Sequence, residues 1–261
     1  MKTYENIEFD INEGVAIISL NRPDVLNSFN FEMADDTIDA LTYSRDDKSI
    51  RTIVLTANGK GFCAGQDLEE ATRENGPNIE EIIEHTYNPI VDLIRNIEKP
   101  VICAVNGVAA GAGANIAIAC DITFAAESAN FIQSFTNIGL VPDSGGTFFL
   151  PRLIGLQRAT AMLFSGDKTS AIEAKEMGMI YETVSDKQLM PVVLDFAKKL
   201  SKRPTKAFGL TKKALNNTFT NSLEEQLVLE QKLQAIAAKT DDHQEGIKAF
   251  FEKRRPNYTG E

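Results

Sequence analysis

Asp143 is the single charged residue in residues 135–146, which read FTNIGLVPDSGG. A carboxyl group among apolar neighbours has its ionised form destabilised, which raises its pKa and strengthens it as a base. A purely structural interpretation fits the same residues, because Asp143 could cap a helix that opens with Ser-Gly-Gly and carries Phe148 to Leu150. Local sequence alone leaves both interpretations open.

Two glycine-rich segments precede this stretch, residues 61–68 (GFCAGQDL) and residues 106–115 (NGVAAGAGAN). Glycine lets a backbone approach a ligand closely, and free N–H groups can stabilise a developing oxyanion. The second segment also opens a helix, whose N-terminus favours negative charge. The alternatives are an ordinary turn capped by Asp67 in the first segment and glycines that only permit close helix packing in the second. Together with a base, such loops would support enolate chemistry.

Two further motifs have simpler explanations. The Asp-Ser-Gly-Gly run at Asp143 resembles that of trypsin-like proteases, but neither His85 nor His243 has the flanking sequence of a catalytic histidine. The basic run FFEKRRP at residues 250–256 could bind phosphates through Lys253, or could be a solvated helix end that favours cations. The sequence therefore argues against a serine protease, and both interpretations of the basic run stay open.

Composition predicts an ordinary soluble protein with a sizeable core. The 261 residues are 43 % apolar and 25 % charged, and a net charge of −10 argues against a nucleic acid partner. No apolar run is long enough to span a bilayer, and acids stand where a signal peptide would be hydrophobic. Three scattered cysteines fit a reducing compartment, so a cytoplasmic location is expected. The two histidines have no metal-ligand spacing, so we expect no metal.

Hydrophobic periodicity predicts an α/β first part and a helical last part. Strands are expected near residues 15–20, 52–57, 101–105, 121–125 and 129–133, with helices at 31–43 and at 82–97, the latter interrupted at Pro89. The acidic residues 69–84 are predicted to be irregular. Helices should follow at 158–164, 170–177, 190–200, 205–215, 222–238 and 242–254. The best boundary, residues 201–204, divides a core (1–200) from a helical region (201–261) whose apolar helices predict self-association.

Several of these segments, taken in order, resemble the enoyl-CoA hydratase/isomerase (crotonase) superfamily over nearly the whole chain. The matching segments are NRP at 21–23 with Leu26 and Asn27, FCAGQDL at 62–68, AVNG at 104–107, GAG at 111–113, IGLVP at 138–142, GGT at 145–147, AKEMGM at 174–179 and FFEK at 250–253. The resemblance implies a ClpP-like spiral of β-β-α units with a C-terminal helical trimerisation region, assembled as a homotrimer or a dimer of trimers. It also implies an acyl-CoA thioester substrate and no separate cofactor.

The resemblance also implies roles for individual residues. Asp143 would act as the single base, together with an oxyanion hole made by the N–H groups of Ala64 and Ala112. The remaining substrate and coenzyme A contacts would come from Leu26, Cys63, Ala64, Gly65, Gln66, Asp67, Leu68, Gly111, Asn115 and Phe135, with Phe250 and Lys253 of a neighbouring subunit at the nucleotide end.

The chain departs from the hydratase pattern at two positions. Hydratases of the family use two glutamates, whereas this chain has Asn115 and Phe135 there, and Asp143 stands where several isomerases keep a single carboxylate. Water would be excluded by Phe135, Ile138, Leu140 and Val141. The resemblance therefore implies an isomerase that shifts a C=C bond, or that turns the ring epoxide of a phenylacetyl-type CoA into an oxepin. The alternatives are an enoyl-CoA hydratase, a hydrolase or dehalogenase with Asp143 as nucleophile, and a non-catalytic RNA-binding relative.

Overall fold

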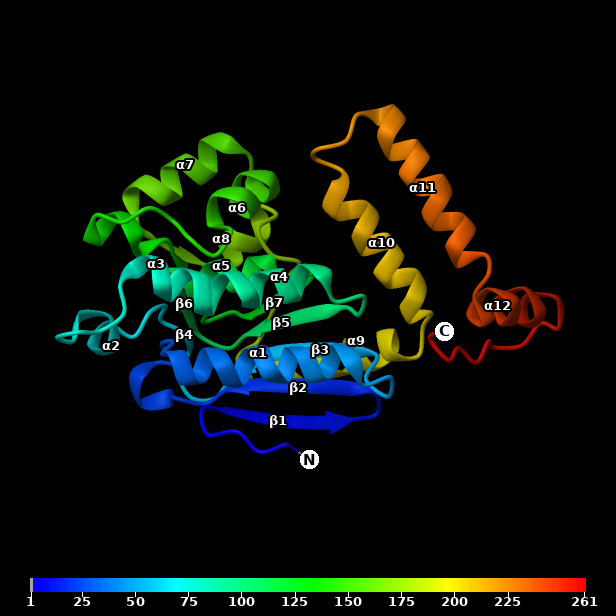
Figure 1. Cartoon of the computed structure of the whole chain (residues 1–261), viewed down its shortest axis with the longest axis horizontal. Helices are drawn as coiled ribbons and strands as arrows, with labels where there is room; N and C mark the ends of the chain where they lie inside the picture. The colour runs from blue at the N-terminus through cyan, green and yellow to red at the C-terminus, as the bar shows by residue number, and fades with distance from the viewer. Residues whose placement is uncertain (1) are drawn as a thin grey trace.

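The computed structural model describes residues 2–261, and within them two sheets carry the core (Figure 1). The larger sheet has the order β1-β2-β3-β5-β7-β10, and the smaller has the order β4-β6-β8-β9. The strands of the larger sheet are β1 (Ile7–Asn12), β2 (Val15–Leu20), β3 (Thr52–Ala57), β5 (Val101–Val105), β7 (Ile122–Ala126) and β10 (Glu182–Val184). Those of the smaller sheet are β4 (Gly61–Cys63), β6 (Val108–Ala110), β8 (Asn130–Ile132) and β9 (Lys168–Ser170).

Helices surround both sheets. They are α1 (Phe31–Asp46), α2 (Leu68–Thr72), α3 (Ile79–Ile82), α4 (Asn88–Asn96), α5 (Ala112–Ala119), α6 (Gly146–Ile154), α7 (Leu156–Ser165), α8 (Ala171–Glu176), α9 (Leu189–Ser201), α10 (Thr205–Asn217), α11 (Leu223–Ala237) and α12 (Asp241–Phe251). Short 3-10 turns occupy η1 (Pro23–Val25), η3 (Ser134–Ile138) and η4 (Asp186–Gln188), and η2 (Ile83–Tyr87) is a π-helix.

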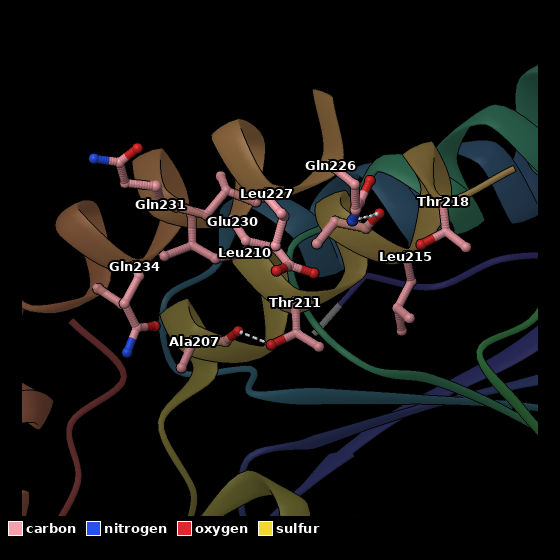
Figure 2. Close-up of a pocket in the computed structure, with 13 residues that line it drawn as sticks. Ala207, Leu210, Thr211, Leu215, Thr218, Gln226, Leu227, Glu230, Gln231 and Gln234 are labelled. Atoms are coloured by element: carbon pink, nitrogen blue, oxygen red, sulfur yellow. Dashed lines mark hydrogen bonds between the residues drawn. The ribbon is translucent and has the colours of Figure 1, made fainter. Parts of the chain in front are cut away.

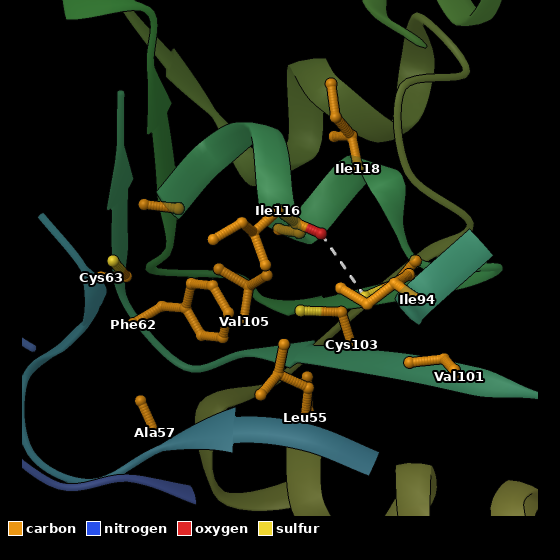
Figure 3. Packing of buried hydrophobic residues seen from close by; sticks show 14 of the residues in the cluster. Leu55, Ala57, Phe62, Cys63, Ile94, Val101, Cys103, Val105, Ile116 and Ile118 are labelled. Carbon is orange, nitrogen blue, oxygen red and sulfur yellow. Dashed lines mark hydrogen bonds between the residues drawn. The ribbon is translucent and has the colours of Figure 1, made fainter. Parts of the chain in front are cut away.

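The central strands are buried throughout because both faces of the larger sheet are covered. Every residue of β3 and of β5 is buried, as expected of parallel strands that have helices on both sides. Helix α9 packs on β2, β3, β5 and β7, and α5 packs on β5 and β7. Figure 3 shows Ile116 of α5 beside Phe62 of β4 and Val105 of β5. This packing holds α5 rigidly at the centre of the molecule.

The smaller sheet brings the glycine-rich segments together. Strands β4, β6 and β8 pair in parallel, so their carboxyl ends lie at one edge of the sheet. They end at Cys63, Ala110 and Ile132, immediately before Ala64, Gly111 and Gln133. In open α/β sheets the carboxyl ends of parallel strands are the usual place for a ligand. The short strands β4 and β6 were not predicted, because three residues are too few for a periodic pattern.

Residues 69–84 differ from their prediction. They contain α2 and α3 rather than only irregular chain, because two side chains cap the helices. Asp67 accepts hydrogen bonds from the N–H groups of Glu69 and Glu70, and Asn78 forms a capping box with Glu81. The predicted interruption near Pro89 is confirmed, since a π-helix joins α3 to α4 and Pro89 lies in the first turn of α4.

Helices α10 to α12 lie to one side of the sheets (Figure 1). An open groove of about 680 Å³ lies between α10 and α11. Figure 2 shows two of the residues that line it, Leu210 of α10 and Leu227 of α11. None of the residues that line the groove belongs to the predicted substrate site. In residues 2–261, no helix combines the length and apolar character needed to cross a membrane.

Candidate active site

Asp143 is half-buried in the loop that joins η3 to α6. The interpretation of Asp143 as a helix cap is wrong, because α6 begins at Gly146 with Gly145 as its N-cap residue and no capping side chain. Ser144, itself buried with φ at 51°, donates from Oγ to Asp143 Oδ1 at 2.8 Å. Burial raises the pKa of the Asp143 carboxyl to about 6, against an opposing effect of the Ser144 hydrogen bond. A carboxyl group with this pKa can both accept and return a proton near neutral pH.

Asn115 holds the main chain of Asp143 and does not face a ligand. It is completely buried, and its Nδ2 donates to the Asp143 carbonyl oxygen at 2.9 Å. Its Oδ1 accepts from Gln133 Nε2, also at 2.9 Å. The expectation that Asn115 contacts substrate is therefore wrong, because both ends of its amide bind protein groups. Gln133 was missed, because nothing in its local sequence distinguishes it from a surface glutamine.

One half of the predicted oxyanion hole is also wrong. The N–H of Ala64 donates to the carbonyl of Leu26 at 3.0 Å, so it is not available to a substrate. In residues 2–261, the N–H groups of Gln66 and Ala112 have no hydrogen-bond acceptor. They are neighbours, because a methyl group added to Gly65 would lie 3.7 Å from the Ala112 nitrogen. Gln66 and Ala112, the first residue of α5, therefore offer a pair of free donors that lie close together.

Tyr87 supports the Gln66 side of this pair. Its hydroxyl donates to Gln66 Oε1 at 2.6 Å, and burial raises the pKa of Tyr87 well above its usual value, so the hydroxyl stays protonated. A parallel bridge between Phe29 and Gln66 fixes the backbone from the other side. Tyr87 ends the π-helix η2, and π-helical turns occur frequently at functional sites. Sequence reasoning missed Tyr87, since a π-turn leaves no distinctive spacing.

The predicted coenzyme A contacts are only partly on one surface. Leu26 and Leu68 are exposed, Ala64 and Gln66 are partly exposed, and Leu26 packs beside Gly61. Asp67 pairs with Arg22 at 2.8 Å in addition to capping α2, which agrees with the structural alternative for this residue.

Cys63 is the exception among these residues. Its side chain is fully buried beneath Gly113, burial raises its thiol pKa to about 12, and a ligand contact by that side chain is ruled out. A Cβ on Gly113 would collide with Cys63, so close packing is a real function of this glycine.

Phe135 lies against the second glycine segment. The tip of its ring would be 3.8 Å from a methyl group on Gly111, and the ring is buried. The other three residues expected to exclude water behave differently. Ile138, Leu140 and Val141 are exposed in the single chain, with Val141 at 78 %. Within one chain, therefore, Phe135 shields the site and these three do not.

Phe250 and Lys253 are not brought to the site by a single chain. Phe250 is exposed at the end of α12, and Lys253 is exposed just after it. Figure 1 shows α12 and β4 at opposite ends of the molecule. Any contact of these two residues with a bound substrate would therefore be made in another subunit.

Comparison with known proteins identifies the family. The profile of the family "Enoyl-CoA hydratase/isomerase" matches residues 10–261. The chain is 44 % identical over 253 residues to the 1,2-epoxyphenylacetyl-CoA isomerase of Escherichia coli K12, covering 96 % of this chain and 97 % of that protein. It is 43 % identical over 258 residues to a protein of Rhodobacter capsulatus named "Probable enoyl-CoA hydratase", covering 99 % of each.

Solved structures agree with the sequence comparison. The crystal structure of the enoyl-CoA hydratase from Bacillus anthracis superposes with a TM-score of 0.91 at 35 % identity, covering 98 % of this chain and 100 % of that one. The expected crotonase fold is thereby confirmed, with its mixed α/β sheets and C-terminal helices. This chain belongs to the enoyl-CoA hydratase/isomerase family.

Proposed function

We propose that the protein is an acyl-CoA isomerase in which Asp143 is the only acid–base residue. The observation that carries this proposal is the pairing of one half-buried carboxyl group, pKa about 6, with Asn115 and Phe135 at the positions where the family's hydratases carry glutamates. An amide that binds protein groups at both ends and a phenyl ring cannot activate water. One base remains, which suits a reaction that removes a proton from one carbon and returns it to another.

The proposed mechanism begins with the thioester carbonyl bound between the N–H groups of Gln66 and Ala112. Asp143 removes a proton next to the carbonyl, and the two donors stabilise the enolate oxygen as charge develops there. One such donor is worth roughly 2.7–4 kcal/mol in a preorganised site. The protonated Asp143 then delivers the proton at the far end of the conjugated system. Ser144 binds Oδ1 of the carboxylate, so we assign the proton transfer to Oδ2.

The acyl group is proposed to be an enoyl or a phenylacetyl-type chain. Two observations support an aromatic or extended group: the similarity to the epoxyphenylacetyl-CoA isomerase, and the phenyl ring of Phe135 beside Gly111. With an enoyl-CoA, the reaction would be a double-bond shift. With an epoxyphenylacetyl-CoA, it would be ring expansion to the oxepin.

The proposal is tested with enoyl-CoA substrates whose double bond lies one carbon beyond conjugation. Conjugation with the thioester is followed by ultraviolet absorbance. Wild-type protein should catalyse the shift, and Asp143→Asn should lose about 10²–10⁴-fold in rate, the usual contribution of a general base. Retention of full activity by Asp143→Asn would mean that another group is the base.

Enoyl-CoA hydration is the second candidate, favoured by the 43 % identity to the Rhodobacter capsulatus protein. It would require Asp143 alone to activate a water molecule. Crotonyl-CoA hydration should be close to background in wild type and should rise in Phe135→Glu, which adds a second carboxylate. Wild-type hydration that disappears in Asp143→Asn would support this second candidate instead.

We also propose that the chain assembles as a homotrimer or a dimer of trimers in the cytoplasm. Support comes from the large apolar side chains that the helical region exposes, namely Leu215, Phe219, Leu223, Leu227, Val228, Ile236, Ile247, Phe250 and Phe251. Light scattering coupled to size-exclusion chromatography measures the mass directly, and a monomer at micromolar concentration would contradict the proposal.

A further inference from the structure

Helix α5 carries two features of the candidate site on one face. Ala112 is its first residue and presents an unpaired N–H group. Asn115 follows three residues later, so the two residues share a helix face and differ by about 4.5 Å along the axis. Every residue of α5 is buried, which leaves the helix little freedom to move.

The Asn115 amide reaches from this helix to the loop of Asp143. Its contact is with the main-chain carbonyl of Asp143, so the carboxylate itself stays free of the amide. Gln133, which is 1 % exposed, fixes the other end of the same amide from the end of β8. A Cβ on Gly146 would collide with the Asn115 amide, so the glycine makes this contact possible.

We infer that Asn115, held by Gln133, sets the position of the Asp143 base relative to the Ala112 N–H group. Asn115 is thus a positioning residue, and α5 is the common support of the base and of one oxyanion donor. The inference rests on the proposed role of Asp143. This positioning role explains why residue 115 is an amide and not a carboxylate, because an ionised glutamate cannot donate to the Asp143 carbonyl.

The expected effect is on turnover and not on substrate binding. A misplacement of about 1 Å in a reacting group can cost about 10²-fold in rate. Asn115 is completely buried and bonded to Asp143 and Gln133, so its loss should not remove a contact with the coenzyme A portion of the substrate. Loss of an interaction that matters only in the transition state lowers kcat and leaves KM nearly unchanged.

The experiment compares Asn115→Leu with Thr123→Val in the double-bond shift assay. A leucine side chain would fill a similar volume to the asparagine but could not donate. Thr123 is a matched control, because its buried hydroxyl donates to the Ala117 carbonyl of the same helix, 2.7 Å away and outside the site. We expect kcat to fall by about 10- to 100-fold in Asn115→Leu with KM within about twofold, and both constants to be unchanged in Thr123→Val.

A second variant keeps the inference testable if Asn115→Leu folds poorly. Gln133→Met removes the donor to Asn115 and retains its bulk, so kcat should fall by a smaller factor, about three- to tenfold. In both variants the acid limb of the kcat profile should move below its wild-type pH, because a displaced Asp143 gains water. An unchanged kcat and an unchanged limb in the folded variants would overturn the inference. If Asp143→Asn also remained active, the proposed function itself would have failed.

Discussion

The two ends of the candidate site use different parts of the chain. At one end the proposed base is a side chain, that of Asp143, and a buried amide and a hydroxyl hold this residue in place. At the other end the proposed donors are the main-chain N–H groups of Gln66 and Ala112, and the side chain of Tyr87 supports Gln66. A base can be removed by one substitution, whereas a main-chain donor can be disturbed only through the conformation of the chain.

The largest effect at the main-chain end should come from Gly65→Ala. Gly65 has φ at +97°, and a Cβ there would lie 3.2 Å from the Ala110 carbonyl oxygen and 3.7 Å from the Ala112 nitrogen. The added methyl group therefore strains the turn and crowds the space between the two donors. We expect kcat to fall by about 10²-fold or more, similar to loss of one oxyanion donor.

Gly155→Ala is the matched control for this substitution. Gly155 also has a positive φ, +80°, but a Cβ there would meet nothing within 4 Å. Both variants should lose thermal stability, because alanine is strained at positive φ, and Gly65→Ala should lose more because its methyl group also crowds the Ala110 carbonyl. Only Gly65→Ala should lose activity. Equal activity in the two variants would show that the turn at Gly65 does not position an oxyanion donor.

The proposed base, Asp143, should determine the pH dependence of kcat/KM on the acid side. Only ionised Asp143 can act as a base, so activity is lost as the pH falls through its pKa of about 6. At pH 5 the rate should be about a tenth of its plateau, whereas a carboxyl with the ordinary pKa near 3.9 would still be almost fully ionised. If kcat/KM fell only near pH 4, the Asp143 carboxyl would be exposed to water, which would contradict its partial burial in the site. The profile is measured in buffers of constant ionic strength.

A smaller effect is expected of Tyr87→Phe. This change keeps the buried ring and removes only the hydroxyl that donates to Gln66 Oε1. Gln66 retains the backbone bridge to Phe29, so its N–H group should be held less firmly but should stay near its position. We expect kcat to fall by about three- to tenfold with the acid limb unmoved, consistent with the loss of one hydrogen bond of about 1 kcal/mol. Besides burial, the charge of Asp143 contributes to the raised pKa of Tyr87, so the two groups are close enough to interact. A shifted acid limb would mean that the Tyr87 hydroxyl also tunes the Asp143 carboxyl.

The same contrast explains what could be predicted from sequence. The partial burial and raised pKa of Asp143 could be predicted because a lone carboxylate in an apolar run can be recognised in the sequence. The buried strands β3 and β5 could be predicted because they are short runs rich in apolar and β-branched residues. Ala64 was assigned wrongly because every residue except proline has an N–H group, and only the fold decides that this one donates to the carbonyl of Leu26. Asn115 was predicted to contact the substrate for a similar reason. Its hydrogen-bond partners, Gln133 and Asp143, are distant in sequence and could not be recognised there.

The smallest effect should come from Lys253→Ala, far from both ends of the site in one chain. If Lys253 of a neighbouring subunit meets the nucleotide phosphates, its loss should raise KM by about two- to fivefold and leave kcat unchanged, because an exposed ion pair is worth roughly 0.2–1 kcal/mol. Lys253→Arg keeps the charge and should behave as wild type. Repeating the measurement at high salt should erase the difference between Lys253→Ala and wild type, since exposed charges are screened. A loss of kcat would instead tie α12 to the reaction centre, and the division between reacting groups and binding groups would need revision.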